Sequence, residues 1–371
     1  MKVILYIGHH KVGSTALQAY LAQNWLQLAQ AGILYPSVEG LGFASNLATI
    51  LRPEAPSQIK QGQVLVREPH SALAYRMIQD AISRPVPPQF NGHPATSQML
   101  RTIQKQVEVL APHTVILCSE AFANFGQVDA KLITQLCAPF QGADLHVYCA
   151  LRRPDHYLAS WHGQRLKVGE PAAPLEPGGL AQYANTIHFN YRNVLEPWIE
   201  QLPDATFSIR NYAEVVENGG SGEDFVLQTG LTLPEGMQAP GRANSSLPKA
   251  SFPIMEQAVA HLPRPKVQAL SQYFQAEGKA LCRKADARNG DVELFGEAQR
   301  KEMHRRFLKE SETYLSQLTG QPAFFEGLDE VLIPRPLPAR EAAHRLLQAL
   351  PEATLAKRKL RDAVATVKAH L

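Results

Sequence analysis

The segment from Val3 to Leu21, VILYIGHHKVGSTALQAYL, constrains the fold more than any other part of the sequence. It begins as an apolar run, passes through a loop that contains Gly8 and Gly13, and ends in a helical pattern. Beyond the loop, large apolar residues recur at three- and four-residue spacing and give the helix one apolar face: Leu17, Leu21, Trp25 and Leu28. A buried strand that leads through a glycine loop into a helix predicts the first unit of an α/β domain.

Three later segments have the same strand-like character, and helical patterns separate them. Thr114–Cys118, Leu145–Leu151 and Thr206–Ile209 are nearly continuous in apolar residues, as is Val3–Ile7. Continuous rather than alternating hydrophobicity is typical of strands that are covered on both faces, as in a parallel sheet. We therefore expect an α/β, P-loop-containing three-layer fold, with a central parallel sheet flanked by helices and a helical C-terminal region.

The rest of the chain is less regular. Residues 50–98 hold many prolines around a short helix predicted near Ala72–Ile82, so we interpret this stretch as an insertion over the sheet edge, where such folds carry substrate specificity. The Pro- and Gly-rich stretch 168–183 is a candidate mobile lid. Helical patterns dominate from Pro248 onward, notably over Glu297–Leu318, and the tail has the alternation of apolar and basic residues expected of a docking helix or a partner surface.

Charge and cysteine content narrow the class of protein. The 37 Lys and Arg residues against 34 Asp and Glu leave a net charge of +3, which is too small for a typical nucleic-acid binder. The cysteines are widely spaced and mostly in apolar surroundings, as in a reducing compartment: Cys118, Cys137, Cys149 and Cys282. No apolar run approaches the ~20 residues of a membrane-spanning helix, and the first strand leads directly into the glycine loop, so we expect no signal peptide and a cytoplasmic, bacterial-type protein.

The loop from Gly8 to Thr15, GHHKVGST, has the length and glycine spacing of a Walker A phosphate-binding loop. Glycines let the backbone approach an anion closely, and the N–H groups at the start of the helix point towards it. In nucleotide hydrolases a lysine follows the second glycine, and the next Ser or Thr holds Mg²⁺. Here Ser14 occupies the lysine position and Lys11 lies inside the loop, which argues against a kinase or GTPase. The competing interpretation is a glycine-rich turn with an exposed lysine.

The run Lys11-Val12-Gly13-Ser14-Thr15 resembles the first motif, K-x-G-[ST]-[ST], of the sulfotransferases that use 3′-phosphoadenosine 5′-phosphosulfate as sulfuryl donor. The residues that follow are similar to bacterial members and to some carbohydrate sulfotransferases: Leu17-Gln18, Asn24 and Gly32-Ile33-Leu34-Tyr35-Pro36. The resemblance implies that the backbone of residues 13–15 and the two hydroxyls of this motif hold the donor's 5′-phosphate.

A second motif lies in VYCALRRPDHYLASWHGQRLK, residues 147–167. The family's site for the donor's 3′-phosphate has an Arg at a strand end, a Pro two residues later and a Ser eight residues later, and Arg152, Pro154 and Ser160 resemble that pattern. A guanidinium grips phosphate with two parallel hydrogen bonds, and a hydroxyl adds a neutral donor. Taken alone, the arginines here would be interpreted as solvated charges at a strand exit.

Three further segments resemble the family less specifically. FSIRNYAEV, residues 207–215, nominates Tyr212 as the aromatic residue near the adenine, with a core tyrosine as the alternative. GRANSSLP, residues 241–248, resembles a bacterial loop that closes over the donor and nominates Arg242 and Asn244, with an ordinary Ser/Asn turn as the alternative. FNYRNVLEPW, residues 189–198, also fits the bacterial pattern. The resemblance covers about residues 1–320, which suggests a sulfotransferase domain over 1–325 and a helical C-terminal extension over 326–371.

The resemblance also implies roles for site residues. Lys11 is expected to stabilise the leaving oxygen, and the chemistry requires no metal. Glu120 is the first candidate for the general base because it follows a buried strand, where such folds place site residues. Its alternatives are to orient Lys11 or to cap the next helix. His10 is the second candidate, and three weaker ones follow: His9, Glu39 and His162.

The function that these features imply is transfer of a sulfuryl group to an acceptor hydroxyl, leaving adenosine 3′,5′-bisphosphate as product. The acceptor is expected on a carbohydrate, a glycolipid or a small metabolite. Two other functions stay open, a P-loop small-molecule kinase and a non-catalytic nucleotide-binding module. The basic C-terminal segment KRKLRDAVATVKAHL favours a solvated helix face over nucleic-acid binding, and it is a candidate contact for a homo-oligomer.

Overall fold

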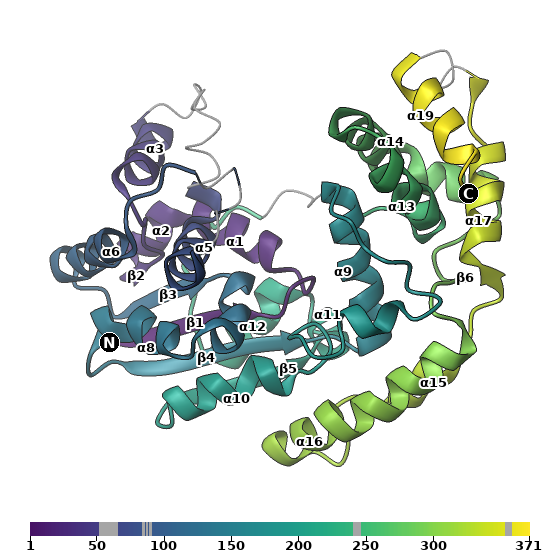
Figure 1. The fold of residues 1–371 in the computed structure, drawn as a ribbon. Helices are drawn as coiled ribbons and strands as arrows, with labels where there is room; N and C mark the ends of the chain where they lie inside the picture. Colours follow the sequence, from purple (N-terminus) through teal and green to yellow (C-terminus); the bar gives the residue numbers. More distant parts are fainter. Residues whose placement is uncertain (52–65, 84–85, 87, 89–90, 240–245, 353–357) are drawn as a thin grey trace. The chain divides into compact units, whose positions relative to one another are not determined.

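A computed structural model describes residues 1–51, 66–83, 86, 88, 91–239, 246–352 and 358–371. The chain forms two compact units, each built from two segments of the sequence (Figure 1). The first unit is Met1–Arg152 with Tyr191–Ala243, and the second is Arg153–Asn190 with Asn244–Leu371. The predicted domain over 1–325 and helical extension over 326–371 stay a prediction.

The first unit is built on a five-stranded sheet in which every strand pair is parallel. Its strand order is β2-β3-β1-β4-β5. The strands are β1 (Lys2–Gly8), β2 (Ile33–Leu34), β3 (Thr114–Cys118), β4 (Asp144–Leu151) and β5 (Thr206–Asn211). The predicted strands are confirmed to within two residues at each end, and so is the parallel sheet flanked by helices.

Alternate residues of the strands explain why the apolar runs are continuous. Ile4 and Tyr6 of β1 face one side of the sheet and join a buried cluster that includes Leu17 and Phe225 from helices. Val3, Leu5 and Ile7, which point to the opposite face, are also fully buried. Both faces of the central strand are therefore covered, as a parallel sheet requires.

The helices of the first unit lie between and after these strands (Figure 1). They are α1 (Ser14–Gln23), α2 (Trp25–Gln30), α3 (Gly40–Leu51), α5 (Pro69–Ile82), α6 (Thr96–Leu110), α7 (Phe125–Val128), α8 (Lys131–Cys137), α10 (Arg192–Gln201), α11 (Tyr212–Glu217) and α12 (Ser221–Thr229), with 3₁₀ turns η2 (Glu120–Asn124) and η3 (Ala138–Phe140). Helix α5 confirms the helix predicted near residues 72–82.

The strand order creates a topological switch point between β1 and β4. These strands are hydrogen-bonded neighbours, but the chain leaves β1 towards β2 at one edge and leaves β4 towards β5 at the other. Loops that depart in opposite directions leave a crevice at the carboxyl ends of the two strands, where α/β folds bind ligands. The glycine loop follows β1 and Arg152 follows β4, so the first motif and the arginine of the second motif lie at this point.

The second unit consists mainly of helices. They are α9 (Pro154–Val168), α13 (Phe252–His261), α14 (Arg264–Lys284), α15 (Gly296–Phe307), α16 (Thr313–Thr319), α17 (Ala339–Gln348) and α19 (Arg358–Lys368), with 3₁₀ turns η4 (Gly179–Gln182), η5 (Lys249–Ser251) and η7 (Leu328–Leu332). A π-helical turn, η6 (Leu308–Glu312), joins α15 to α16 and confirms the predicted helix over 297–318. Two short parallel strands, β6 (Val292–Glu293) and β7 (Leu337–Pro338), were not predicted.

The stretch 168–183, predicted as a candidate lid, is held by hydrogen bonds inside the second unit. Arg165 of α9 donates to the carbonyl of Pro171 at 2.5 Å and to the side chain of Gln182 at 2.9 Å. Gln182 in turn donates to the carbonyl of Ala173 at 2.9 Å. The loop is thus connected to α9 at both ends.

The C-terminal helix uses its apolar face within the chain. Leu360, Ala363, Val364 and Val367 of α19 are buried, and α19 contacts α13 and α14. Homo-oligomer formation through this helix stays a prediction.

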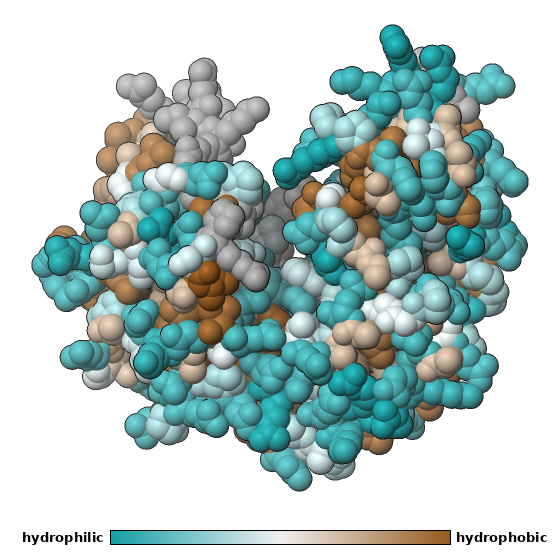
Figure 2. Space-filling model, viewed as in Figure 1, coloured by the Kyte–Doolittle hydropathy of each residue, from teal (hydrophilic) through white to brown (hydrophobic). Residues whose placement is uncertain are grey.

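On the face of the molecule that Figure 2 shows, patches of hydrophobic residues are separated by hydrophilic residues. No helix in the described part of the chain has the length and apolar character that crossing a bilayer requires, and the cytoplasmic location stays a prediction.

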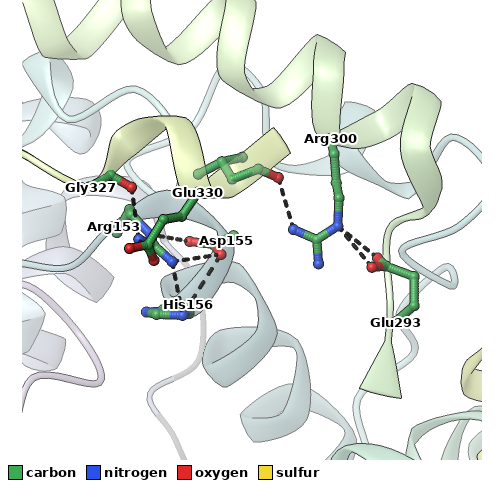
Figure 3. Close-up of polar contacts among 8 residues, drawn as sticks. Arg153, Asp155, His156, Glu293, Arg300, Gly327 and Glu330 are labelled. Carbon is green, nitrogen blue, oxygen red and sulfur yellow. Dashed lines mark hydrogen bonds and ion pairs between the residues drawn. The ribbon is translucent and has the colours of Figure 1, made fainter. Parts of the chain in front are cut away.

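A buried ion pair joins β6 to α15 in the second unit (Figure 3). Arg300, 3% exposed, donates through Nε to both carboxylate oxygens of Glu293 at 3.0 and 2.8 Å, and through Nη1 to the carbonyl of Val331 at 2.9 Å. The backbone N–H groups of Phe295 and Arg335 also donate to Glu293. Burial raises the pKa of Glu293, but these hydrogen bonds outweigh it and hold the pKa below its usual value of 4.5.

A second cluster fixes the start of α9 (Figure 3). Arg153 donates to Asp155 at 2.9 Å, to the carbonyl of Gly327 at 2.8 Å and to Glu330 at 2.6 Å. Gly327 and Glu330 lie at the start of the predicted C-terminal extension over 326–371. Hydrogen bonds therefore join the start of this extension to α9 within the second unit.

Replacing Arg300 by Met is expected to destabilise the protein by about 3–5 kcal/mol, because it leaves the Glu293 carboxylate buried without its cation. Urea denaturation measures the free energy of unfolding. The matched control is Arg305→Met, whose guanidinium is 69% exposed and paired with Glu302, and it should cost less than about 1 kcal/mol. Equal losses in the two variants would contradict the assignment.

The same pair predicts the direction of the pH dependence. Because the pKa of Glu293 is lowered in the folded state, its stabilisation is present above the ordinary value of 4.5 and is lost as the pH falls through the folded-state pKa. The difference in unfolding free energy between wild type and Arg300→Met should therefore shrink on acidification below about pH 4.5.

Candidate active site

The glycine loop leaves β1 with an irregular register. Tyr6 pairs with Tyr148, but Gly8 pairs with Cys149, so β1 gains one residue relative to β4 at this point. Gly8 has a φ of 116°, and a Cβ on it would lie 3.3 Å from backbone atoms of Glu120. The N–H of His9 then donates to the carbonyl of Ala150 at 2.8 Å. The start of the loop therefore lies between the ends of β3 and β4 and contacts the chain at both.

The loop turns into α1 through two left-handed residues. Lys11 has a φ of 63° and Gly13 a φ of 86°. A non-glycine residue in this region is uncommon and costs roughly 1 kcal/mol, so the surrounding contacts must hold Lys11 there. Gly13 is the N-cap of α1, and its carbonyl accepts from Ala16 and Leu17.

The first turn of α1 has the features of an anion site. The first four N–H groups of a helix have no acceptor within the helix, and the helix dipole makes this end partly positive. Ser14 is buried and Thr15 is exposed, so the two predicted hydroxyls lie in different surroundings at the same helix end. The residues predicted to hold a phosphate therefore form a helix N-terminus.

Arg152, Lys11 and Tyr212 lie together although they are far apart in the sequence. Nη1 of Arg152 lies 3.5 Å from the carbonyl oxygen of Lys11, and its guanidinium carbon lies 5.4 Å from the centre of the Tyr212 ring. The carbonyl of Arg152 accepts from the hydroxyl of Tyr191 at 2.5 Å. Tyr212 is the first residue of α11, directly after β5, where Asn211 caps the helix by accepting from Ala213.

Glu120 lies at the end of β3, on the other side of the loop. Its Oε2 accepts from Nε2 of Gln18 at 2.9 Å, and Gln18 is a buried residue of α1. The alternative role of capping the next helix belongs to its neighbour, because the hydroxyl of Ser119 accepts from the N–H of Ala121. The Glu120 carboxylate is thus half-buried and oriented by α1.

The end of β3 is held by a neutral histidine. Nε2 of His70 donates to the carbonyl of Pro36 at 3.0 Å, and Nδ1 accepts from the N–H of Cys118 at 3.0 Å. Burial lowers the pKa of His70 to about 3, so the ring is uncharged at neutral pH. The sequence analysis gave no role to His70. Its role in holding the end of β3 is identified only by its position between Pro36 and Cys118.

His10 is also uncharged at neutral pH. Burial, and then the nearby charge of Lys11, lowers its pKa to about 4. Its Nε2 lies 3.4 Å from Nδ2 of Asn124, and its ring is 6% exposed. The buried His10 ring is less accessible to an incoming substrate than the half-buried carboxylate of Glu120.

The three weaker base candidates each contact other groups of the protein. His9 is fully buried, with its ring centre 5.3 Å from that of Tyr191. Glu39 accepts from the N–H groups of Leu41 and Gly42 at the start of α3. His162 is buried in the second unit, 3.1 Å from the hydroxyl of Tyr183 and 3.0 Å from Glu256.

The structure does not test the other predicted donor contacts. Ser160 is a half-buried residue of α9, which belongs to the second unit, and its pairing with Arg152 stays a prediction. Arg242 and Asn244 lie outside the described residues. Within the described ranges, no three or more His, Cys, Asp or Glu side chains are grouped so that they could hold a metal ion.

Sequence reasoning missed Ser221, the first residue of α12. Its hydroxyl donates to the carbonyl of Val12 at 2.6 Å, and a Cβ on Gly13 would lie 2.2 Å from this hydroxyl oxygen. The signal in the sequence is the segment NGGSGED, in which glycines precede an acidic first helical turn.

Comparison with known proteins gives no match to a family model, to a curated protein or to a solved structure. The first unit is thus an α/β unit in which a glycine loop follows β1 at the topological switch point.

Replacing Gly13 by Ala should destabilise the first unit more than replacing Gly142 by Ala. Both glycines have positive φ, 86° and 76°, but a Cβ on Gly142 meets open space while one on Gly13 overlaps Ser221. The strain common to both is about 1–2 kcal/mol, and overpacking should add about 1–3 kcal/mol for Gly13→Ala. Urea denaturation compares the variants, and equal losses would show that Ser221 does not pack on the loop.

Proposed function

We propose that the protein is a sulfotransferase that moves a sulfuryl group from 3′-phosphoadenosine 5′-phosphosulfate to an acceptor hydroxyl. The observation that carries this proposal is the proximity of Lys11, Arg152 and Tyr212 at the ends of β1, β4 and β5. Each was selected from the sequence by a separate motif, and the parallel sheet brings all three to one edge.

Their chemistry fits the parts of this donor. Lys11 and the first turn of α1 supply positive charge and N–H groups for the 5′-phosphosulfate. Arg152 supplies a planar guanidinium for the phosphate on the ribose, a group that ATP lacks. Tyr212 supplies an aromatic ring beside Arg152, suited to the neighbourhood of the adenine.

The reaction that we propose is an in-line displacement at sulfur. The acceptor oxygen attacks the sulfur while its proton passes to the Glu120 carboxylate, and the bond between sulfur and the bridging phosphate oxygen breaks. The electron pair of that bond stays on the phosphate oxygen, where the Lys11 ammonium stabilises the charge. The products are a sulfate ester and adenosine 3′,5′-bisphosphate, and the Glu120 proton is returned to solvent.

The position of Glu120 supports its role as base. It follows the strand beside β1, its backbone lies against Gly8, and the Gln18 amide orients its carboxylate. For the acceptor, a hydroxyl on a carbohydrate, a glycolipid or a small metabolite stays the proposal, since much of the 50–98 insertion lies outside the described residues.

Lys11→Ala is expected to lower kcat by about 10²–10³-fold, because it removes the charge that stabilises the leaving oxygen. Arg152→Ala is expected to raise the Kd for adenosine 3′,5′-bisphosphate by about 10- to 100-fold, since it removes a charged hydrogen-bond donor. Transfer from radiolabelled donor to a carbohydrate panel gives kcat, and isothermal titration gives Kd.

The matched control is Lys105→Ala, which removes a lysine that is 66% exposed on α6 of the same unit and should change neither value. Full transfer by Lys11→Ala would end the mechanistic proposal. Activity that needs ATP and Mg²⁺ would instead identify a kinase, and nucleotide binding without transfer to any acceptor would identify a binding module.

Glu120→Gln tests the base, because the amide keeps the size of the side chain but cannot accept the acceptor's proton. We expect kcat to fall about 10²–10⁴-fold with the donor Kd unchanged. His10→Asn should have a much smaller effect on kcat. A near-normal rate in Glu120→Gln together with a large loss in His10→Asn would transfer the role to His10.

A further inference from the structure

The loop of the candidate site is bonded to a helix that comes more than two hundred residues later. The hydroxyl of Ser221 donates to the carbonyl of Val12 at 2.6 Å, across a sequence separation of 209. Ser221 is 8% exposed, so water reaches this bond poorly. A buried carbonyl that loses its donor is costly, which makes the bond a firm constraint on the loop.

This bond sets the orientation of one peptide unit. A trans peptide is planar, and its C=O and N–H point in opposite directions. Because the Val12 carbonyl is bonded to Ser221, the N–H of Gly13 must point away from α12. Gly13 has a φ of 86° and no side chain to resist rotation, so without the bond the peptide is free to turn its carbonyl into the anion site.

Helix α12 is itself fixed to the sheet. Asp224, fully buried, accepts from the hydroxyl of Tyr148 on β4 at 2.7 Å and from the side chain of Asn218 at 2.7 Å. The Tyr148 ring stacks on that of Tyr6 on β1, with 5.3 Å between ring centres. Ser221 therefore approaches the loop from a helix that is hydrogen-bonded to β4 and packs on Tyr6 of β1, the strand from which the loop departs.

We propose that Ser221 is a positioning residue for donor binding, which holds the Val12–Gly13 peptide so that the Gly13 N–H faces the 5′-phosphate of the nucleotide. The inference rests on the proposed function, and it adds a residue that no sequence motif selected. Ser221 acts through the loop backbone and does not itself take part in the transfer.

The test is titration of adenosine 3′,5′-bisphosphate into the full-length protein. Ser221→Ala should bind the nucleotide about tenfold more weakly than wild type, as expected for the loss of one backbone donor at the phosphate. In turnover assays the KM for the donor should rise by a similar factor, while the KM for the acceptor and kcat stay close to wild type. Ser221→Thr keeps the hydroxyl and should restore most of the affinity.

Ser208→Ala is the matched control, because Ser208 donates to the carbonyl of Gln228 near the opposite end of α12. It removes a hydroxyl contact of the same helix without touching the loop, so its nucleotide affinity should equal that of wild type. Thermal melts of all three variants separate a loss of folded protein from a loss of affinity.

The inference is overturned if wild type binds the nucleotide and Ser221→Ala binds it equally well. It is also overturned if Ser208→Ala and Ser221→Ala lose affinity to the same extent, since the effect would then come from general loosening of α12. Failure of the wild type to bind the nucleotide at all overturns the proposed function, and this inference with it.

Discussion

The pairing of β1 with β4 is the constraint on which the candidate site depends. These neighbouring strands send their following connections to opposite edges of the sheet, and their carboxyl ends carry the glycine loop and Arg152. The register changes between Tyr6 and Gly8, and the N–H of His9 continues the pairing with Ala150. An extra residue at a strand end redirects the chain, which is how the loop comes to pass beside Arg152.

Polar groups around this edge divide into those that hold the framework and those that face the loop. His70 is buried between two backbone partners, and Glu39 accepts from the first amides of α3. Such groups are satisfied inside the protein and have little capacity for a ligand. Glu120 differs, because the side-chain amide of Gln18 rather than backbone N–H groups orients its carboxylate, and its backbone lies beside the start of the loop. The proposed base is thus distinguished by its surroundings rather than by its residue type.

Support for the loop comes from elements distant in sequence. Helix α12 bonds to Val12 through Ser221, and Asp224 fixes the same helix to β4. In the second unit, the Glu293–Arg300 pair and the contacts of Arg153 serve a comparable purpose, since they tie residues 326–335 to α15 and to the start of α9. In both units a buried carboxyl group with several hydrogen-bond partners joins elements that are distant in the sequence.

What the sequence determined by itself is local. It comprises the four apolar strands, the glycine loop with Lys11 before α1, and the placement of Glu120, Arg152 and Tyr212 close after strands. These follow from hydrophobic periodicity and from backbone chemistry over a few neighbouring residues. The strand order, the partner of each carboxylate and histidine, the division into two units and the role of Ser221 were decided only by the tertiary structure. They depend on which distant elements bury their faces against each other, and no short stretch of sequence carries that information.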